Sequence, residues 1–333
     1  MNRVFINGFG RIGRCICKIL FEDYNTIEIV QINDPNISID NAVYLLKHDS
    51  IYGAFAADIY KECDYIVIET SARKMQILYT DNVNVCNLRH ADFLIESSDQ
   101  KYECESLNSL NFKKVFLTKW LNDAHRIVLD GLTINNNIAL PKVISCGICD
   151  TAAIIPFLLQ FNSLDVESIN ITTMHPFLGY QNVLDGPPRD VKHTNNPHYQ
   201  LGRSSFNSVI PKKSSVQEIL EKVFPHYKGK LSFMTYRIPT DSVTVCDINI
   251  LFYPEVSKEK IEQIIENLSK LSINEDTPLI SRDFAFSKKS FEYDKHWTLL
   301  TGRNLHCTLW YNNELGYSAT VCRLICKELT ESL

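Results

Sequence analysis

Three glycines near the N-terminus have a spacing that could bind phosphate groups. Residues 7–14 read NGFGRIGR, which places Gly8, Gly10 and Gly13 in the pattern GxGxxG. In such a turn the first glycine permits a tight reversal from strand to helix, the second lets the backbone approach a pyrophosphate, and the third lets the helix pack on the strand. The pattern therefore predicts a turn that binds a dinucleotide.

The residues around this turn supply the structural context that the motif needs. A short apolar strand is expected at Arg3–Asn7 and an amphipathic helix at Arg11–Glu22, so the backbone N–H groups of Arg11 and Ile12 open a helix and attract a pyrophosphate. After a second expected strand comes Asp34, where a carboxylate can accept from both hydroxyls of an adenosine ribose. Because a carboxylate repels a 2′-phosphate, we expect NAD rather than NADP.

Composition and charge exclude several classes of protein. The chain has 333 residues, 45% of them hydrophobic, and a net charge of −5. This length suits two domains of ordinary size. Because the chain has no excess of positive charge, we do not expect it to bind nucleic acid or membrane surfaces. The N-terminus lacks the features of a secretion signal, so we expect a cytoplasmic protein.

Eleven cysteines are scattered along the chain. An odd count without a secretion signal is typical of reduced thiols in the cytosol. Cys146 and Cys149 form a CxxC pair that could be half of a zinc site or a redox dithiol, but a zinc site would need a second pair of ligands at similar spacing. No convincing second pair is found, so no metal is expected.

The alternation of elements changes midway along the chain. Strand-like and helix-like patterns alternate up to residue 145, which predicts a doubly wound parallel sheet of the Rossmann type. Residues 146–315 contain longer alternating strands, which predict an α+β domain with a mixed or antiparallel sheet. The last helix, expected at residues 316–333, should return to the first domain. The expected strands and helices are these: Val4–Asn7, Ile27–Ile32, Tyr65–Glu69, Phe93–Glu96, Lys114–Leu117, Arg126–Leu129, Lys142–Ser145, Asp165–Met174, Leu231–Ile238, Val243–Phe252, Phe284–Phe286 and Trp297–Leu300 as strands, and Val216–Phe224 and Lys258–Ser272 as helices.

Seven local matches, in order along the whole chain, resemble the glyceraldehyde-3-phosphate dehydrogenase family. They are NGFGRIGR at residues 7–14, NDP at 33–35, YLLKHDSIYG at 44–53, SC at 145–146, TTMH ending at His175, KGKLSFMTYRIPT at 228–240 and WYNNELGYS at 310–318. The resemblance implies an NAD-dependent dehydrogenase that forms a thioester with its aldehyde substrate. It also implies a homotetramer.

The resemblance assigns roles to individual residues. It makes Cys146 the nucleophile that attacks an aldehyde and His175 the general base. Asn313 matches the asparagine that holds the nicotinamide carboxamide. Four residues match or adjoin positions that contact phosphate on the substrate or the attacking phosphate: Ser145, Arg203, Ser214 and Arg237.

Departures from the family pattern concentrate around the phosphate sites. The usual Ser-Cys-Thr-Thr-Asn-Cys is replaced by Ser-Cys-Gly-Ile-Cys-Asp at residues 145–150, and Leu178 and Tyr180 replace polar residues after His175. Asp150 would disfavour a nearby thiolate, or it could cap the following helix. The long loop 176–211, which carries Lys192, His193 and His198, is expected to be functional.

These departures leave several functions open. The first is phosphorylating oxidation of glyceraldehyde 3-phosphate, or of another phosphorylated or charged aldehyde. The second is a hydrolysing enzyme on an aldehyde such as erythrose 4-phosphate, which the loss of phosphate-binding hydroxyls favours. The remaining two are an NAD-binding protein that has lost catalysis and a thiol-redox protein based on Cys146 and Cys149.

Overall fold

The computed structural model describes residues 2–81, 91–136, 140–188, 199–270 and 277–330. They form two compact units, of which the first comprises Met1–Ile148 and Glu314–Leu333 and the second Cys149–Asn313. Residues 146–148 thus group with the first unit, whereas the sequence placed the boundary after residue 145. Lys192, His193 and His198 lie outside the described residues.

The first unit is built on a ten-stranded sheet in the order β3-β4-β5-β2-β1-β6-β7-β10-β8-β9. The seven strands from β5 to β8 in this order are parallel, and antiparallel hairpins extend both edges. The strands are β1 (Asn2–Asn7), β2 (Ile27–Asn33), β3 (Asp58–Glu62), β4 (Tyr65–Glu69), β5 (Lys74–Thr80), β6 (Phe93–Glu96), β7 (Lys114–Leu117), β8 (Arg126–Leu129), β9 (Leu132–Asn135) and β10 (Val143–Ser145).

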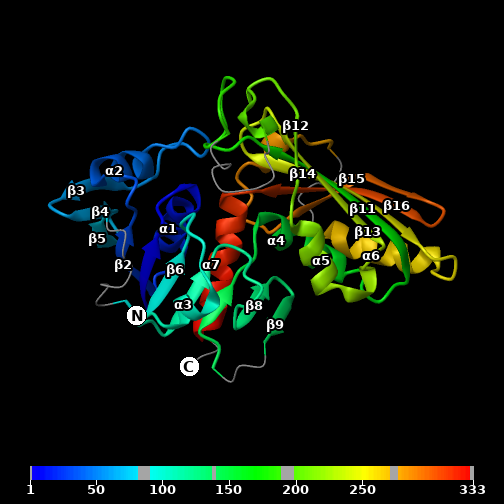
Figure 1. Cartoon of the computed structure of the whole chain (residues 1–333), viewed down its shortest axis with the longest axis horizontal. Coiled ribbons are helices and arrows are strands. Elements are labelled where there is room, and N and C mark those ends of the chain that lie inside the picture. The colour runs from blue at the N-terminus through cyan, green and yellow to red at the C-terminus, as the bar shows by residue number, and fades with distance from the viewer. Residues whose placement is uncertain (1, 82–90, 137–139, 189–198, 271–276, 331–333) are drawn as a thin grey trace. The chain divides into compact units, whose positions relative to one another are not determined.

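Four helices accompany this sheet: α1 (Arg11–Asp23), α2 (Ile39–Lys47), α3 (Cys104–Asn108) and α7 (Leu315–Thr330). The C-terminal helix α7, red in Figure 1, packs against α1. Its buried Glu328 accepts from Lys114 of β7 and Arg126 of β8, at 3.1 and 2.8 Å. A buried carboxylate needs such partners, and these contacts fix the end of the helix to the sheet.

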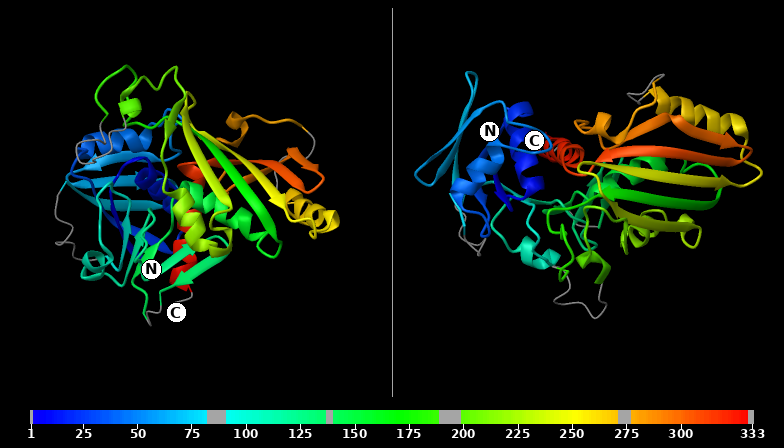
Figure 2. Two further views of the ribbon diagram at one scale, coloured as in Figure 1. Left: turned by 45° about the vertical axis from the view of Figure 1, so that its right-hand side comes forward. Right: turned by 90° about the horizontal axis from the view of Figure 1, so that it is seen from above.

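The second unit is built on a six-stranded mixed sheet in the order β12-β13-β11-β14-β16-β15. Only β11 and β13 are parallel, and the other pairs are antiparallel. Figure 2 shows the long strands side by side. The strands are β11 (Val166–Pro176), β12 (Ile210–Lys212), β13 (Leu231–Ile238), β14 (Val243–Phe252), β15 (Glu292–Thr301) and β16 (Asn304–Asn312).

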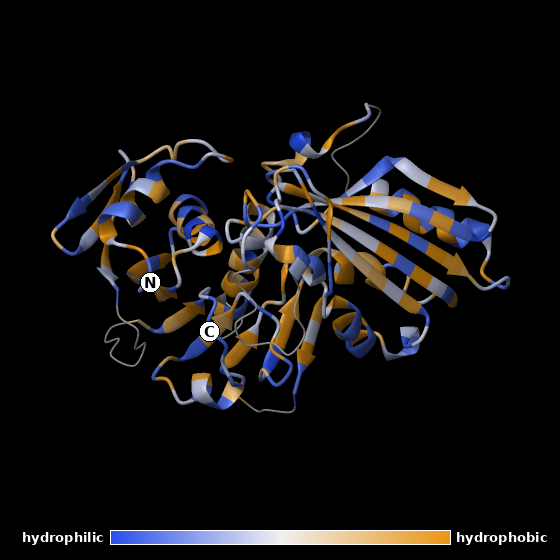
Figure 3. Cartoon of the chain, turned by 45° about the horizontal axis from the view of Figure 1, so that its top comes forward, coloured by the Kyte–Doolittle hydropathy of each residue, from blue (hydrophilic) through white to orange (hydrophobic). Residues whose placement is uncertain are grey.

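Alternating side chains divide this sheet into two faces. The stripes along its strands in Figure 3 are the apolar and polar residues of a period-two pattern. Its helices are α4 (Cys149–Leu159), α5 (Val216–Val223) and α6 (Lys258–Lys270), with short 3-10 turns η2 (Tyr199–Gly202), η3 (Pro225–Tyr227) and η4 (Ser281–Phe284). Among the described residues, no helix combines the length and apolar character that crossing a bilayer requires.

The predicted fold class is confirmed, although several elements differ. The strand expected at Phe284–Phe286 is wrong, because η4 ends there. Strands β3, β5, β9, β12 and β16 were not predicted, and β15 begins five residues before the expected Trp297. The ends of the helices expected at Lys258–Ser272 and at 316–333 reach beyond the described residues.

Candidate active site

The glycine turn between β1 and α1 has the backbone that its sequence predicts. Gly8 has φ +93°, and a Cβ there would lie 2.4 Å from the backbone nitrogen of Ser98. A Cβ on Gly13 would lie 2.1 Å from the carbonyl oxygen of Gly8. By contrast, a Cβ on Gly10 would meet nothing within 4 Å among the described atoms. The first and third glycines are thus required by packing, and Gly10 leaves open space beside the start of the helix.

Asp34 lies beside this turn with its carboxylate buried. One oxygen accepts from the backbone N–H of Phe9 at 2.8 Å, and the other accepts from Asn36 at 2.9 Å. Each carboxylate oxygen can accept more than one hydrogen bond, so capacity for ribose hydroxyls remains. Together with the open space at Gly10, this arrangement fits an NAD molecule.

Arg11 and Ile12 form the first turn of α1. The guanidinium of Arg11 forms an ion pair with Glu314, which also accepts from the hydroxyl of Tyr52 at 3.2 Å. The side chain of Arg11 therefore binds the carboxylate of Glu314. Its backbone N–H at the start of the helix is the group that is predicted to bind the cofactor.

In the second unit, one end of the mixed sheet gathers the polar side chains of four strands. His175 near the end of β11 is in register with Arg237 near the end of β13. Thr244 at the start of β14 is in register with Tyr311 near the end of β16. Because β11 pairs Met174 with Val245 of antiparallel β14, His175 and Thr244 come next along these strands.

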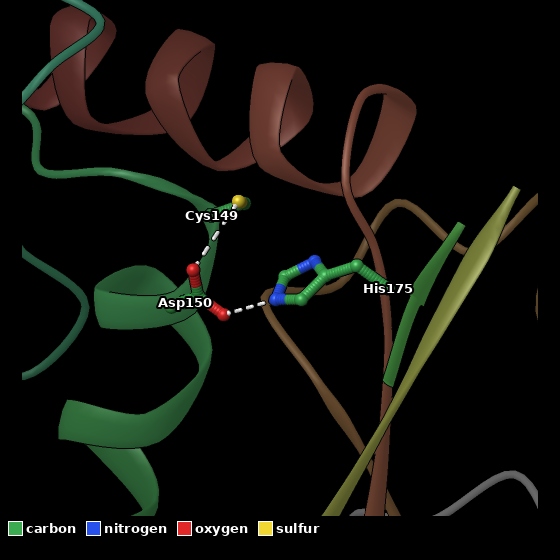
Figure 4. Close-up of side chains that lie close together, drawn as sticks. All are labelled: Cys149, Asp150 and His175. Carbon is green, nitrogen blue, oxygen red and sulfur yellow. Dashed lines mark hydrogen bonds and ion pairs between the residues drawn. The ribbon is translucent and has the colours of Figure 1, made fainter. Parts of the chain in front are cut away.

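Helix α4 begins beside this row and contributes a thiol and a carboxylate. Asp150 Oδ1 is 2.8 Å from His175 Nε2 and accepts from the Tyr311 hydroxyl at 2.5 Å. Cys149 Sγ is 3.9 Å from Asp150 Oδ2. Figure 4 shows the three side chains of Cys149, Asp150 and His175 pointing toward one another. The sulfur of Cys149, a carboxylate oxygen of Asp150 and a ring nitrogen of His175 all lie within 4.8 Å of one another. Asp150 lies between the thiol and the imidazole (Figure 4).

Burial and charge set the protonation of this cluster. Burial, and next the carboxylate of Asp150, raise the pKa of the Cys149 thiol well above its ordinary value. Burial alone would also raise the pKa of Asp150, but His175, Tyr311 and Arg237 outweigh it and lower that pKa. Near neutral pH the site therefore holds a carboxylate at Asp150 and a protonated thiol at Cys149.

A second set of hydrogen bonds continues from the other ring nitrogen of His175. The Nδ1 atom is 3.0 Å from the hydroxyl oxygen of Thr244. That hydroxyl donates to the side-chain oxygen of Asn313 at 2.7 Å. The chain of contacts thus runs from Asp150 through the imidazole and Thr244 to Asn313, and all of these residues are buried.

Cys149 belongs to the cluster with His175, and the predicted nucleophile Cys146 belongs to the first unit. Cys146 follows β10 in the first unit, where its side chain is fully buried and its N–H donates to Leu117 O at 2.9 Å. Burial, with a smaller contribution from Glu328, raises the pKa of its thiol to about 12. The described cluster of thiol, carboxylate and imidazole contains Cys149 instead.

The sequence pattern does not distinguish the two cysteines. With the first cysteine of the family motif placed at Cys146, the identical positions are Ser145 and Cys146. With that cysteine placed at Cys149, they are Cys149 and Thr151. Both registers give two matches, so the choice depends on which thiol meets His175 in the fold.

The predicted phosphate-binding residues have different surroundings. The buried hydroxyl of Ser145 donates to Lys119 O at 2.8 Å and accepts from Leu121, so it serves the packing of its own unit. Arg203 is exposed and pairs with Asp185 at 3.0 Å. Ser214 is exposed just before α5 and accepts from the N–H of Val216. Arg237 alone of the four contributes to the electrostatics of the cluster.

Two residues of the cluster, Thr244 and Tyr311, were not singled out from sequence, although Tyr311 lies in the WYNNELGYS match. For Asp150 the sequence gave two alternatives, a charge that disfavours a nearby thiolate and a helix cap. Its carboxylate raises the pKa of Cys149, as the first alternative predicts. It lies within α4, and its carboxylate binds partners on β11 and β16.

Comparisons with known proteins cover most of the chain. Residues 2–101 match the family model described as glyceraldehyde 3-phosphate dehydrogenase, NAD binding domain, and residues 148–313 match the model of the C-terminal domain. The predicted cofactor NAD is thereby confirmed.

Curated relatives are similar over nearly their full lengths. Glyceraldehyde-3-phosphate dehydrogenase of Phaffia rhodozyma is 30% identical over 343 residues, covering 97% of this chain and 96% of the relative. Glyceraldehyde-3-phosphate dehydrogenase 2 of Saccharomyces cerevisiae is 28% identical, with 98% of each chain covered. The Eremothecium gossypii enzyme is 29% identical with the same coverage. The chain belongs to the glyceraldehyde-3-phosphate dehydrogenase family, as an NAD-dependent oxidoreductase that acts on an aldehyde group.

Proposed function

We propose that this protein oxidises an aldehyde that carries a phosphate or another negative charge, through a thioester on Cys149. The observation that carries the proposal is the cluster of the half-buried Cys149 with the buried Asp150 and His175. A thiol, a carboxylate and an imidazole within 4.8 Å of one another can form a covalent bond to a carbonyl carbon and move the protons that the reaction releases.

The cofactor would be held by residues of the glycine turn and by Asp34, with Asn313 holding the nicotinamide carboxamide as in the resemblance. When bound, NAD supplies an oxidised ring that accepts a hydride. The protein's own contribution is to bind the aldehyde, to form the carbon–sulfur bond and to accept the hydroxyl proton as the thioester forms. His175 and Asp150 are the groups next to the thiol that can do this.

Arg237 is the proposed contact for the negative charge of the substrate. It lies in register with His175 on the neighbouring strand, and its charge already acts on both Cys149 and Asp150. A guanidinium presents several donors in a planar fork and suits a phosphate dianion. Ser214 and Arg203 remain candidates for a second phosphate contact.

A second candidate function differs only in how the acyl group is released. With Cys149 as the nucleophile, Asp150 stands where the family motif has the first threonine. A carboxylate repels a phosphate dianion, so Asp150 favours water over inorganic phosphate as the acyl acceptor. The product would then be a free acid, as in a hydrolysing dehydrogenase of the erythrose 4-phosphate type.

Two further expectations accompany the proposal. We propose a homotetramer in the cytosol, from the family resemblance and from the scattered cysteines, of which the ten described ones are all free. Analytical ultracentrifugation of the purified protein would contradict the tetramer if it returned a monomer at micromolar concentration.

The test is a panel of phosphorylated aldehydes with NAD, followed by NADH absorbance with and without inorganic phosphate. The proposal expects NADH from at least one aldehyde and none from Cys149→Ala. Turnover that needs phosphate would assign the phosphorylating reaction, and turnover without it would assign hydrolysis. NAD binding without NADH from any aldehyde would instead identify an inactive paralogue.

A further inference from the structure

The protonation of His175 follows from counting hydrogens along its contacts. The hydroxyl of Thr244 has one hydrogen, and it donates that hydrogen to Asn313. Toward His175 Nδ1, Thr244 can therefore only accept, so Nδ1 carries a hydrogen. At the opposite side of the ring, Nε2 faces the ionised Asp150, which can also only accept. Both ring nitrogens thus face groups that accept from them.

A ring nitrogen that donates a hydrogen bond cannot accept a proton from the thiol. Both nitrogens of His175 are committed, one to Asp150 and one to Thr244, whereas Asp150 has a second oxygen. That oxygen, Oδ2, lies 3.9 Å from Cys149 Sγ, within reach of a thiol hydrogen bond. Asp150 is thus the group that touches the reacting sulfur and can accept a proton.

We propose that Asp150 is the catalytic proton acceptor of this site and that His175 serves as a fixed positive charge that holds Asp150 ionised and in position. This assignment rests on the proposed oxidation through Cys149. It changes the role expected for His175 from the sequence, where the histidine was the base, and it names a residue that the family motif does not contain.

The proposed steps balance in protons and electrons. The Sγ–H bond of Cys149 breaks and its proton passes to Asp150 Oδ2, while sulfur bonds to the aldehyde carbon. The former carbonyl oxygen takes that proton back, which gives a thiohemiacetal. NAD, when bound, would supply the acceptor for the carbon–hydrogen electron pair, which leaves as hydride. Asp150 would then accept the hydroxyl proton, and the thioester would remain.

Groups from every neighbouring element bear on the charge of Asp150. His175 on β11, Tyr311 on β16 and Arg237 on β13 lower the pKa of Asp150. Cys149, on the same helix, interacts with the carboxylate as well. On β14, the buried thiol of Cys246 has its pKa raised by burial and next by the carboxylate of Asp150. The cationic groups favour the carboxylate, so the acceptor is ready at neutral pH.

Asp150→Asn tests the proposal because it keeps the shape and removes the proton acceptor. We expect the rate of NADH formation to fall about 10²–10⁴-fold, the usual contribution of a general base. Alkylation of Cys149 by iodoacetamide at pH 7 should become faster, because the carboxylate that raises the pKa of the thiol is gone. Local unfolding would also expose the thiol, so the melting temperature of the variant is measured beside the two rates and should stay unchanged.

The matched control is Asp247→Asn on β14. Asp247 forms an Asp–His pair of the same length, 2.8 Å to His306 Nε2, but is half exposed and lies outside the cluster. It should leave turnover and alkylation unchanged. His175→Gln is a second variant for the case in which Asp150→Asn does not fold. Removing the charge that lowers the pKa of Asp150 should move the acid limb of the rate profile to higher pH, because the carboxylate is then protonated at a higher pH.

Three outcomes would overturn the assignment of Asp150. They are an Asp150→Asn enzyme as active as wild type, a joint loss of activity and thiol reactivity, or a His175→Gln rate profile whose acid limb does not move to higher pH. Wild-type protein that makes no NADH from any aldehyde would instead defeat the proposed function itself. The two failures are therefore distinguishable.

Discussion

Two turns from a parallel strand into a helix carry the chemistry of this protein, and they differ in what they use. The turn from β1 to α1 works through its backbone: glycines at positions 8 and 13 allow close packing, and Gly10 leaves space. The turn from β10 to α4 works through the side chains of Cys149 and Asp150. A backbone site is specified by adjacent residues, whereas a side-chain site depends on partners supplied by distant strands.

The largest expected effect is a difference in activity between alanine variants of the two cysteines in the second turn. Cys149→Ala should lower NADH formation about 10⁴-fold or more, as removal of a nucleophile does in other enzymes. Cys146→Ala should keep most of its activity, because that thiol is fully buried in the first unit. Steady-state assays of both variants with one aldehyde would settle the choice, and equal losses would contradict it.

A smaller effect is expected in the first turn, where packing and binding can be separated. Gly13→Ala places a Cβ 2.1 Å from a backbone oxygen and should destabilise the first unit by about 2 kcal/mol or more. Gly10→Ala meets nothing and should keep the melting temperature, while NAD binding weakens about tenfold because the methyl occupies the space for pyrophosphate. Urea unfolding and calorimetric NAD titration measure the two effects. A Gly10→Ala protein with unchanged affinity would show that NAD does not approach there.

The smallest effect concerns the hydroxyl that supports Asp150. The bond from Tyr311 helps to keep the pKa of Asp150 low, so Tyr311→Phe should raise that pKa. The carboxylate is the active form, and its protonation begins at a higher pH in the variant. The acid limb of the pH–rate profile should therefore move to higher pH, with activity at neutral pH reduced by no more than about tenfold, the scale of one hydrogen bond to a charged group. A limb that moves to lower pH, or does not move, would contradict the role of Tyr311.

The same difference between backbone and side-chain sites explains what the sequence could predict. The glycine turn, Asp34 and the alternation of strands and helices are local patterns, and they led to the fold class and to NAD. His175 and Arg237 were identified because each lies in a recognisable strand motif.

The remaining parts of the site depend on pairing between strands. Thr244 meets His175 only because β14 runs antiparallel to β11, and Tyr311 meets Asp150 only because β16 lies beside β14. No strand was predicted at β16, so its contribution could not be foreseen. The motif matches Cys146 and Cys149 equally well, so it could not choose between them.

The position of α7 has a consequence for how the chain is made. The second unit is one continuous stretch, Cys149–Asn313, whereas the first needs residues 314–333 to complete it. Glu328, which binds Lys114 and Arg126, is synthesised only after the whole second unit. The first unit can therefore be completed only after the second has been made, and deletion of α7 would remove the carboxylate that binds Lys114 and Arg126.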